Sequence, residues 1–328
     1  MPLPFILGGA ALIAGLAGAK KGIDGIIDSN KADEIMDEAK YILENAKNRM
    51  EIAKTNTKNS IENLGKEKIK ASAKELKDFV RIYKKLKNVN LLETNMIDEL
   101  NGTKEVSEKT LSVMREISLN AADILGSGIA GIGAGVLLGW GTYGGVMALG
   151  TASTGTAIAG LSGVAATNAT LAWLGGGAIA AGGGGIALGT AVLGGIIAGP
   201  ALLIAGGLFS SKAKEKLDNA YSNKAKATHI ASDIEIAVAK LDHINKTTHQ
   251  ITDLLIKVRK YSDILNTRMS TIVFIKTEWS EFTQEEKNIV AGAVKMVQLL
   301  KKILNTPLLT NEGSLTEDAK LLAQQDLW

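Results

Sequence analysis

Hydrophobic residues recur every seven positions along two long stretches of the chain, and this pattern predicts two long helices. The first stretch runs from about residue 28 to 88. Its first heptad positions hold only small residues: Ala32, Ala39, Ala46, Ala53 and Ser60. The second stretch, residues 212–276, keeps seven heptads from Ala227 to Ile272, with Thr248 and Ser262 as polar members of the seam. A period of 3.5 residues kept over this length is typical of coiled coils.

Shorter helices are expected on either side of the second stretch. One begins near Thr103 and runs into the centre of the chain. Another begins at Thr283, where Glu286 three residues later completes a capping box, and ends before Pro307. A short helix is expected from near Thr316. Because no segment alternates with the period of a strand, the predicted fold is all-α.

The centre of the chain, residues 124–211, has a different chemistry. These 88 residues contain no Asp, Glu, Lys, Arg or His and hold 26 of the 36 glycines. Disorder is disfavoured, since disordered segments are polar and charged. Residues 126–131 and 139–144 match the G-x-G-x-x-G pattern, but helical sequence precedes them and the next acid is Glu215, so a nucleotide site is not predicted. We call this segment the neutral block.

Small residues recur every fourth position within the neutral block. In an apolar helix this spacing aligns a groove in which a second helix backbone approaches closely, so the block is interpreted as a glycine-zipper helical hairpin in or entering a membrane. The residues expected to pack helices are Gly131, Gly135, Gly139, Gly155, Gly163, Gly185, Gly189, Gly195 and Gly199. Those expected at the water–lipid boundary are Trp140, Tyr143 and Trp173.

Two further readings of the apolar segments stay open. Gly, Ala, Ser and Thr partition only weakly into lipid, so the neutral block could instead be packed inside a soluble bundle and released later. Residues 1–22 form an apolar N-terminal helix with small residues at every fourth position from Ala10 to Gly22, or residues 1–19 are a removed signal segment.

Composition excludes several classes of function. The chain has no cysteine, and its three histidines, His229, His243 and His249, fall at outer heptad positions, so we predict no catalytic residue, metal site or cofactor. A net charge of +3 argues against nucleic-acid binding. Residues 66–87 form a basic amphipathic helix that suits either a solvated bundle or an anionic lipid surface.

Three passages of the sequence resemble a widespread group of uncharacterised bacterial proteins with a glycine-rich apolar centre between long helices. They are GAKKGIDGIID at residues 18–28, the glycine-rich run at residues 169–206, and the closing TPLLTNEGSLTED. This resemblance implies a bacterial origin and no particular activity. In architecture alone, the chain is similar to α-helical pore-forming toxins and to apolipoprotein L.

These observations predict five regions: the N-terminal helix (1–22), an amphipathic helical region (23–123), the neutral block (124–211), a long coiled-coil helix (212–276), and C-terminal helices with a tail (277–328). The expected function is non-enzymatic permeabilisation or remodelling of a bilayer, as in a bacterial toxin or defence effector. The alternative is a membrane-anchored coiled-coil scaffold. The expected partners are a lipid bilayer and further copies of the chain, joined through the coiled-coil helices, but no nucleotide. The expected location is the bacterial inner membrane, or the cytoplasm with conditional insertion.

Overall fold

The computed structural model describes residues 24–96, 98, 100–126, 132, 134–143, 216–310 and 313–325, and these residues form an all-α protein. The prediction of an all-α fold is therefore confirmed for the described part of the chain. Its elements, in order, are α1 (Asp24–Ala71), the π-helix η1 (Ser72–Leu76), α2 (Lys77–Tyr83), the 3-10 turn η2 (Leu91–Glu93), α3 (Glu108–Gly126), α4 (Ala134–Tyr143), α8 (Lys216–Ile275), the 3-10 turn η6 (Trp279–Glu281), α9 (Gln284–Asn305) and α10 (Glu317–Ala323).

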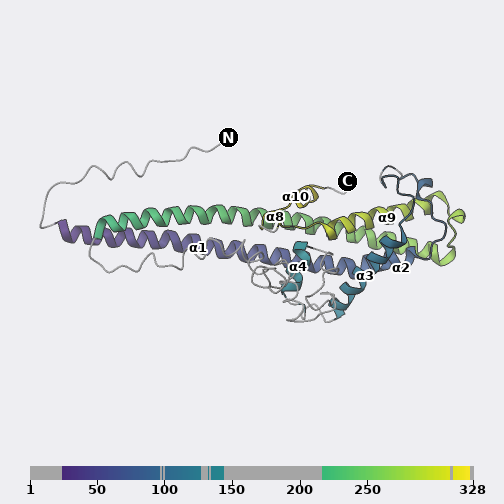
Figure 1. Cartoon of the computed structure of the whole chain (residues 1–328), viewed down its shortest axis with the longest axis horizontal. Coiled ribbons are helices and arrows are strands. Elements are labelled where there is room, and N and C mark those ends of the chain that lie inside the picture. Colours follow the sequence, from purple (N-terminus) through teal and green to yellow (C-terminus); the bar gives the residue numbers. More distant parts are fainter. Residues whose placement is uncertain are drawn as a thin grey trace, which may run out of the picture.

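Helices α1 and α8 lie side by side along the long axis of the molecule and run in the same direction (Figure 1). The heptads of the two helices meet in register, since Ala39 shares a hydrophobic cluster with Ala227, and Ala46 shares one with Ile234. Each of these pairs is separated by 188 positions in the sequence. Small residues at the first heptad position let the two backbones approach closely, as in a tight helix pair.

The apolar seams of the two coiled-coil stretches are thus buried against each other within one chain. Seam residues of α8 such as Ile234, Leu241 and Leu255 are fully buried, and polar Thr248 is also buried, its hydroxyl donating to the Ile244 carbonyl. Joining copies of the chain through these helices stays a prediction, and it would need a surface other than this seam.

The molecule divides into a thin part and a thick part along its axis (Figure 1). We call the thin part, residues 24–60 of α1 with residues 216–243 of α8, the stalk. Its core consists of three small clusters in which alanine predominates. The remaining described residues form the body, where one large hydrophobic core joins the ends of α1 and α8 to α2, α3, α4, α9 and the segment before α10.

Local sequence signals set the ends of the C-terminal helices. Thr283 accepts a hydrogen bond from the Glu286 amide while the Glu286 carboxylate accepts one from the Thr283 amide, so the predicted capping box is present at the start of α9. Helix α9 ends before Pro307, and Thr316 caps α10. The first long helix ends earlier than the expected residue 88, since a π-helical turn interrupts it and α2 ends at Tyr83.

The parallel arrangement of α1 and α8 separates α4, within the neutral block, from the start of α8, which follows the block in the sequence. Helix α4 contacts α1 at Ile61, whereas the start of α8 at Ala220 clusters with Ala32. At 1.5 Å per residue these two positions on α1 are about 40 Å apart. No helix within the described residues is long and apolar enough to cross a membrane. Most of the neutral block, with the expected glycine-zipper hairpin, lies outside the described residues.

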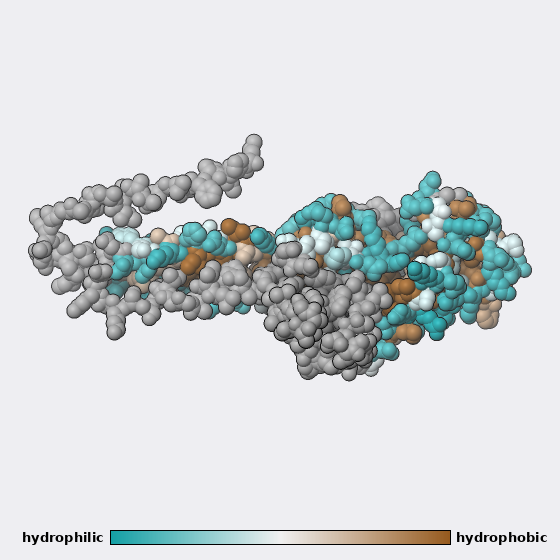
Figure 2. Space-filling view, in the orientation of Figure 1, coloured by the Kyte–Doolittle hydropathy of each residue, from teal (hydrophilic) through white to brown (hydrophobic). Residues whose placement is uncertain are grey.

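Figure 2 shows that hydrophilic residues cover much of the described surface, with hydrophobic residues interspersed along the helices. This distribution is typical of amphipathic helices whose apolar stripe is turned inward.

Candidate functional site

The last described part of the neutral block is α4, which crosses α1. Gly65 of α1 and Gly141 of α4 lie at this crossing. A methyl group on Gly65 would lie 1.9 Å from the Leu137 carbonyl oxygen, and one on Gly141 would lie 2.2 Å from the Ile61 carbonyl oxygen. The two backbones are therefore in direct contact, and any larger side chain at either glycine forces the helices apart.

Lys68, one turn after Gly65, is buried beneath α4. Its side chain is 1 % exposed, and its ammonium group donates long hydrogen bonds to the carbonyl oxygens of Gly141 (3.4 Å) and Thr306 (3.5 Å). These carbonyls belong to the C-terminal ends of α4 and α9, where the helix dipoles favour a cation. Burial nevertheless lowers the pKa of Lys68 to about 7, because removing an ammonium group from water disfavours its charged form.

The remaining contacts of α4 are apolar or involve the backbone. Trp140 is 1 % exposed and belongs to the large core of the body. The Thr142 carbonyl accepts a hydrogen bond from the Leu308 amide (2.6 Å), which ties the end of α4 to the segment after α9. The buried Thr142 hydroxyl has no hydrogen-bond partner. Helix α4 is thus held by shape and apolar contact more than by polar bonds.

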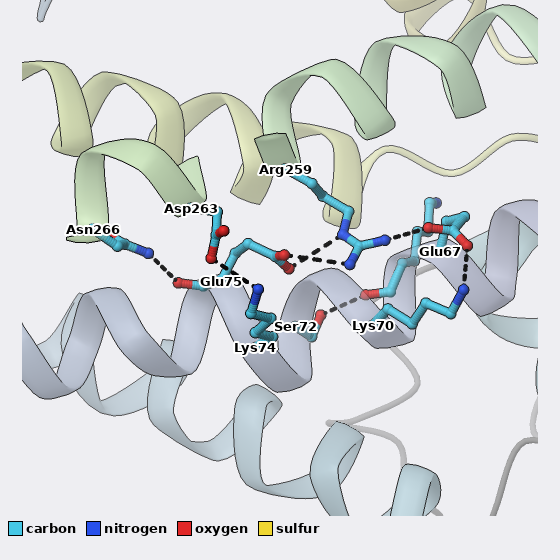
Figure 3. Close-up of polar contacts among 9 residues, drawn as sticks. Glu67, Lys70, Ser72, Lys74, Glu75, Arg259, Asp263 and Asn266 are labelled. Carbon is cyan, nitrogen blue, oxygen red and sulfur yellow. Dashed lines mark hydrogen bonds and ion pairs between the residues drawn. The ribbon is translucent and has the colours of Figure 1, made fainter. Parts of the chain in front are cut away.

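A polar cluster on the other side of α1 joins it to α8 (Figure 3). Arg259 of α8 lies between two carboxylates of the first helical stretch, Glu67 and Glu75, and is hydrogen-bonded to both. Asn266 donates to the Glu75 carbonyl oxygen (2.9 Å) within the π-helical turn η1, where the regular pattern of backbone bonds changes. The burial of Glu75 raises its pKa, and Arg259 opposes this by stabilising the carboxylate.

The polar cluster provides cohesion and shows no arrangement suited to catalysis. Exposed ion pairs extend it, such as Lys74 with Asp263 (2.8 Å). Both carboxylates are engaged by a cation that is itself held between them, so neither is presented to a substrate. Among the described residues, no group of three or more His, Cys, Asp or Glu side chains is placed to hold a metal ion.

Few of the residues expected to pack membrane helices fall within the described part of the chain. Gly135 and Gly139 lie in α4, and Gly139 is buried. Trp140 lies in the core of the body, while Tyr143 is the last residue of α4. Outside the described residues lie Gly131, Gly155, Gly163, Gly185, Gly189, Gly195, Gly199 and Trp173. Their packing roles, and a boundary role for the aromatic residues, stay predictions.

The exposure of the three histidines could be predicted from the sequence pattern, whereas the burial of Lys68 could not. His229, His243 and His249 are exposed on α8, as their heptad positions predicted. By contrast, the burial of Lys68 is not evident from the sequence, because this residue lies within a run of basic residues typical of a solvated helix face. One available signal was Gly65, the only glycine in residues 28–88, since an isolated helical glycine often marks a close backbone contact.

Comparison with known proteins supplies no further assignment. No protein-family model, no curated protein and no solved structure matches this chain.

Proposed function

We propose that this chain is a non-enzymatic, membrane-active helical protein that inserts its neutral block into a bilayer and permeabilises or remodels it. The class of protein meant is a membrane-permeabilising toxin or defence effector. The observation that carries the proposal is that a 68-residue segment without ionisable side chains, residues 144–211, directly follows one short, apolar helix, α4, which packs on a charged helical body.

Insertion of the neutral block requires α4 to leave α1. The block is followed in the sequence by the start of α8, which packs on the stalk about 40 Å from the α4 crossing, so a docked α4 keeps its own part of the block on the body. When α4 is released, its apolar residues become available to enter lipid together with residues 144–211. In this proposal, the α1–α4 crossing is the contact that controls insertion.

Two incompletely hydrogen-bonded polar groups at the crossing favour the release of α4 from α1. Lys68 is desolvated beneath α4 with only two long hydrogen bonds, and Thr142 keeps a buried hydroxyl without a partner. Buried polar groups with incomplete hydrogen bonding cost about 1–3 kcal/mol each. Undocking α4 returns both groups to water, and this gain offsets part of the apolar contact that is lost.

Dye release from vesicles of phosphatidylcholine and phosphatidylglycerol tests the proposal. The unaltered chain is expected to release an entrapped dye, and Gly65→Ala is expected to accelerate release several-fold because its methyl group collides with the Leu137 carbonyl. Gly292→Ala is the matched control, since its methyl group meets only ordinary contacts 3.6 Å away on Leu265. This control should leave the rate of release unchanged.

Two outcomes would contradict the proposal. Vesicles that retain their dye while the chain is demonstrably bound would rule out permeabilisation. Equal rates for Gly65→Ala and the unaltered chain, with circular dichroism confirming that both are folded, would show that undocking of α4 does not limit insertion.

A membrane-anchored scaffold is the second candidate, and the parallel α1–α8 stalk favours it because such a rod suits a spacer. A scaffold would bind vesicles through the neutral block without releasing dye. Its binding to vesicles would also be unchanged by Gly65→Ala. The same pair of measurements therefore separates the two candidates.

A further inference from the structure

Exposed hydrophobic side chains gather at one end of α8. In the described part of the chain, eleven large hydrophobic residues are exposed, and five of them lie between residues 256 and 275. Phe274 is 92 % exposed and Ile275 is 76 % exposed at the last turn of the helix. Single exposed hydrophobic residues are ordinary, whereas a group on one helix indicates an interaction surface.

These residues share one side of the helix. Ile256, Ile264 and Phe274 follow the spacing of one helical face, opposite the residues of α8 that pack in the body core, such as Leu255 and Val258. We call this exposed side of residues 256–275 the outer face of α8.

Three basic residues of the outer face are exposed. They are Lys257, Lys260 and Arg268, and none of them forms an ion pair with another described residue. The single acid in residues 256–275, Asp263, lies one heptad after Ile256 on the same side of the helix and pairs with Lys74 of η1 (2.8 Å). The face therefore combines apolar side chains with three cations that no described carboxylate pairs.

Helix α2 adds further cations beside the outer face. Arg81 of α2 and Phe274 of α8 line the same open groove of about 500 Å³. Lys77 is exposed four positions before Arg81 on the same side of α2, and Lys85 is exposed in the turn that follows the helix. Asp78, which also lines the groove, pairs with Arg81 (2.9 Å).

We infer that the outer face of α8, with the adjoining cations of α2, binds the surface of an anionic lipid bilayer. This inference rests on the proposed function and adds the orientation in which the chain meets the membrane. Charge complementarity identifies the occupant, because lysine and arginine attract anionic headgroups while Phe274 and Ile275 enter the boundary between headgroups and acyl chains. An amphipathic helix with a basic polar face binds in this way without crossing the bilayer.

Co-sedimentation of the full chain with vesicles tests the inference. Vesicles of phosphatidylcholine with phosphatidylglycerol are compared with vesicles of phosphatidylcholine alone. Each cation near an anionic surface contributes about fivefold to binding, so Lys257→Gln, Lys260→Gln and Arg268→Gln together should weaken binding to anionic vesicles roughly 100-fold. Phe274→Ser with Ile275→Ser should weaken it about tenfold or more.

Matched controls come from the stalk. Tyr41→Ser with Ile52→Ser removes two exposed hydrophobic residues, and Lys31→Gln, Lys47→Gln and Lys240→Gln together remove three exposed cations. Both controls should bind anionic vesicles within about twofold of the unaltered chain. If they weaken binding as much as the α8 variants do, the attraction comes from overall charge and hydrophobicity, and the inference is wrong.

Dye release measured on the same samples separates this inference from the proposed function. If the α8 variants bind and release dye as the unaltered chain does, the inference fails while the proposed function stands. If the α8 variants lose binding, and the unaltered chain binds without releasing dye, the inference stands and permeabilisation fails. Binding that is equal on both kinds of vesicle also overturns the inference.

Discussion

The stalk and the body contain the same two helices but stabilise them differently. In the stalk, α1 and α8 pack against each other and against no other described helix, and small clusters of alanine with a few larger residues form the core. In the body, the same helices are covered by α2, α3, α4 and α9 around one continuous core. The comparison indicates that a two-helix pair needs small residues for close approach, whereas a multi-helix core can enclose large side chains and even a lysine.

The two regions also differ in the polar groups that they bury. Where stalk and body meet, the Thr57 hydroxyl donates to the Leu241 carbonyl oxygen (3.0 Å), which satisfies it locally. The body buries the charged cluster of Arg259, Glu67 and Glu75, and separately the solitary Lys68. The stalk also buries one charged residue, Lys54, but pairs it with Glu51 within the same helix, whereas the body draws the partners of Arg259 from a second helical stretch.

The largest expected effect comes from breaking the charged cluster of the body. Arg259→Met leaves two carboxylates without their cation and should lower the free energy of unfolding by about 3–5 kcal/mol. Lys74→Met, which removes a largely exposed ion pair with Asp263, should cost less than about 1 kcal/mol. Urea denaturation of both variants measures the two losses in the free energy of unfolding. Equal losses would show that the buried cluster contributes no more to stability than an exposed ion pair.

The loss in Arg259→Met should also depend on pH in a defined direction. Burial already raises the pKa of Glu75, and removal of Arg259 raises it further. The folded state then binds a proton more tightly than the unfolded state, so stability falls as pH rises through the raised pKa. The variant should consequently be closer to the unaltered chain at pH 5 than at pH 8.

An intermediate effect should distinguish the two cores directly. Leu255→Ala in the body and Leu43→Ala in the stalk remove the same atoms from buried positions. We expect a loss of about 3–4 kcal/mol in the body and about 2 kcal/mol or less in the stalk, since the thin pair of helices closes more easily over the missing side chain. Hydrogen exchange should place the Leu43 loss in the stalk alone; a loss shared by the body would indicate that the whole rod unfolds as one unit.

The smallest expected effect, and the only gain, comes from Lys68→Met. The pKa of Lys68 is lowered in the folded state, so the unfolded state binds a proton that the folded state does not at pH values between about 7 and the ordinary value of 10.5. Stability of the unaltered chain should therefore fall by up to about 2 kcal/mol as pH decreases from 9 to 7. Methionine should raise stability at pH 7 by about 1–2 kcal/mol and flatten this dependence, because an apolar side chain avoids the cost of burying the ammonium group.

Urea unfolding at pH 7 and pH 9 measures the effect of Lys68→Met, with Lys66→Met as a control for the loss of an adjacent, partly exposed lysine. The control should retain the pH dependence of stability that the unaltered chain shows. If Lys68→Met also retains this pH dependence, a group other than Lys68 is responsible for it. A slower release of dye by this variant would connect the stability of the crossing to insertion.

The sequence by itself determined the features that depend on near neighbours in the chain. Heptad spacing predicted the long helices and the buried side of α8, the pair Thr283 and Glu286 predicted the start of α9, and Pro307 predicted its end. These signals are local because helix formation and capping involve residues within about one turn. The lack of charge over residues 124–211 likewise requires no structure to be recognised.

Only the tertiary structure decided which helices pack against each other and which basic residues are buried by that packing. The pairing of Arg259 with Glu67 joins residues 192 positions apart, and the crossing at Gly65 and Gly141 joins two separate segments. Periodicity tells which side of a helix is covered but not by what, because many partners satisfy the same apolar stripe. Lys68 lies within a basic run in the sequence, and only the helix packed over it makes it a buried, weakly held cation.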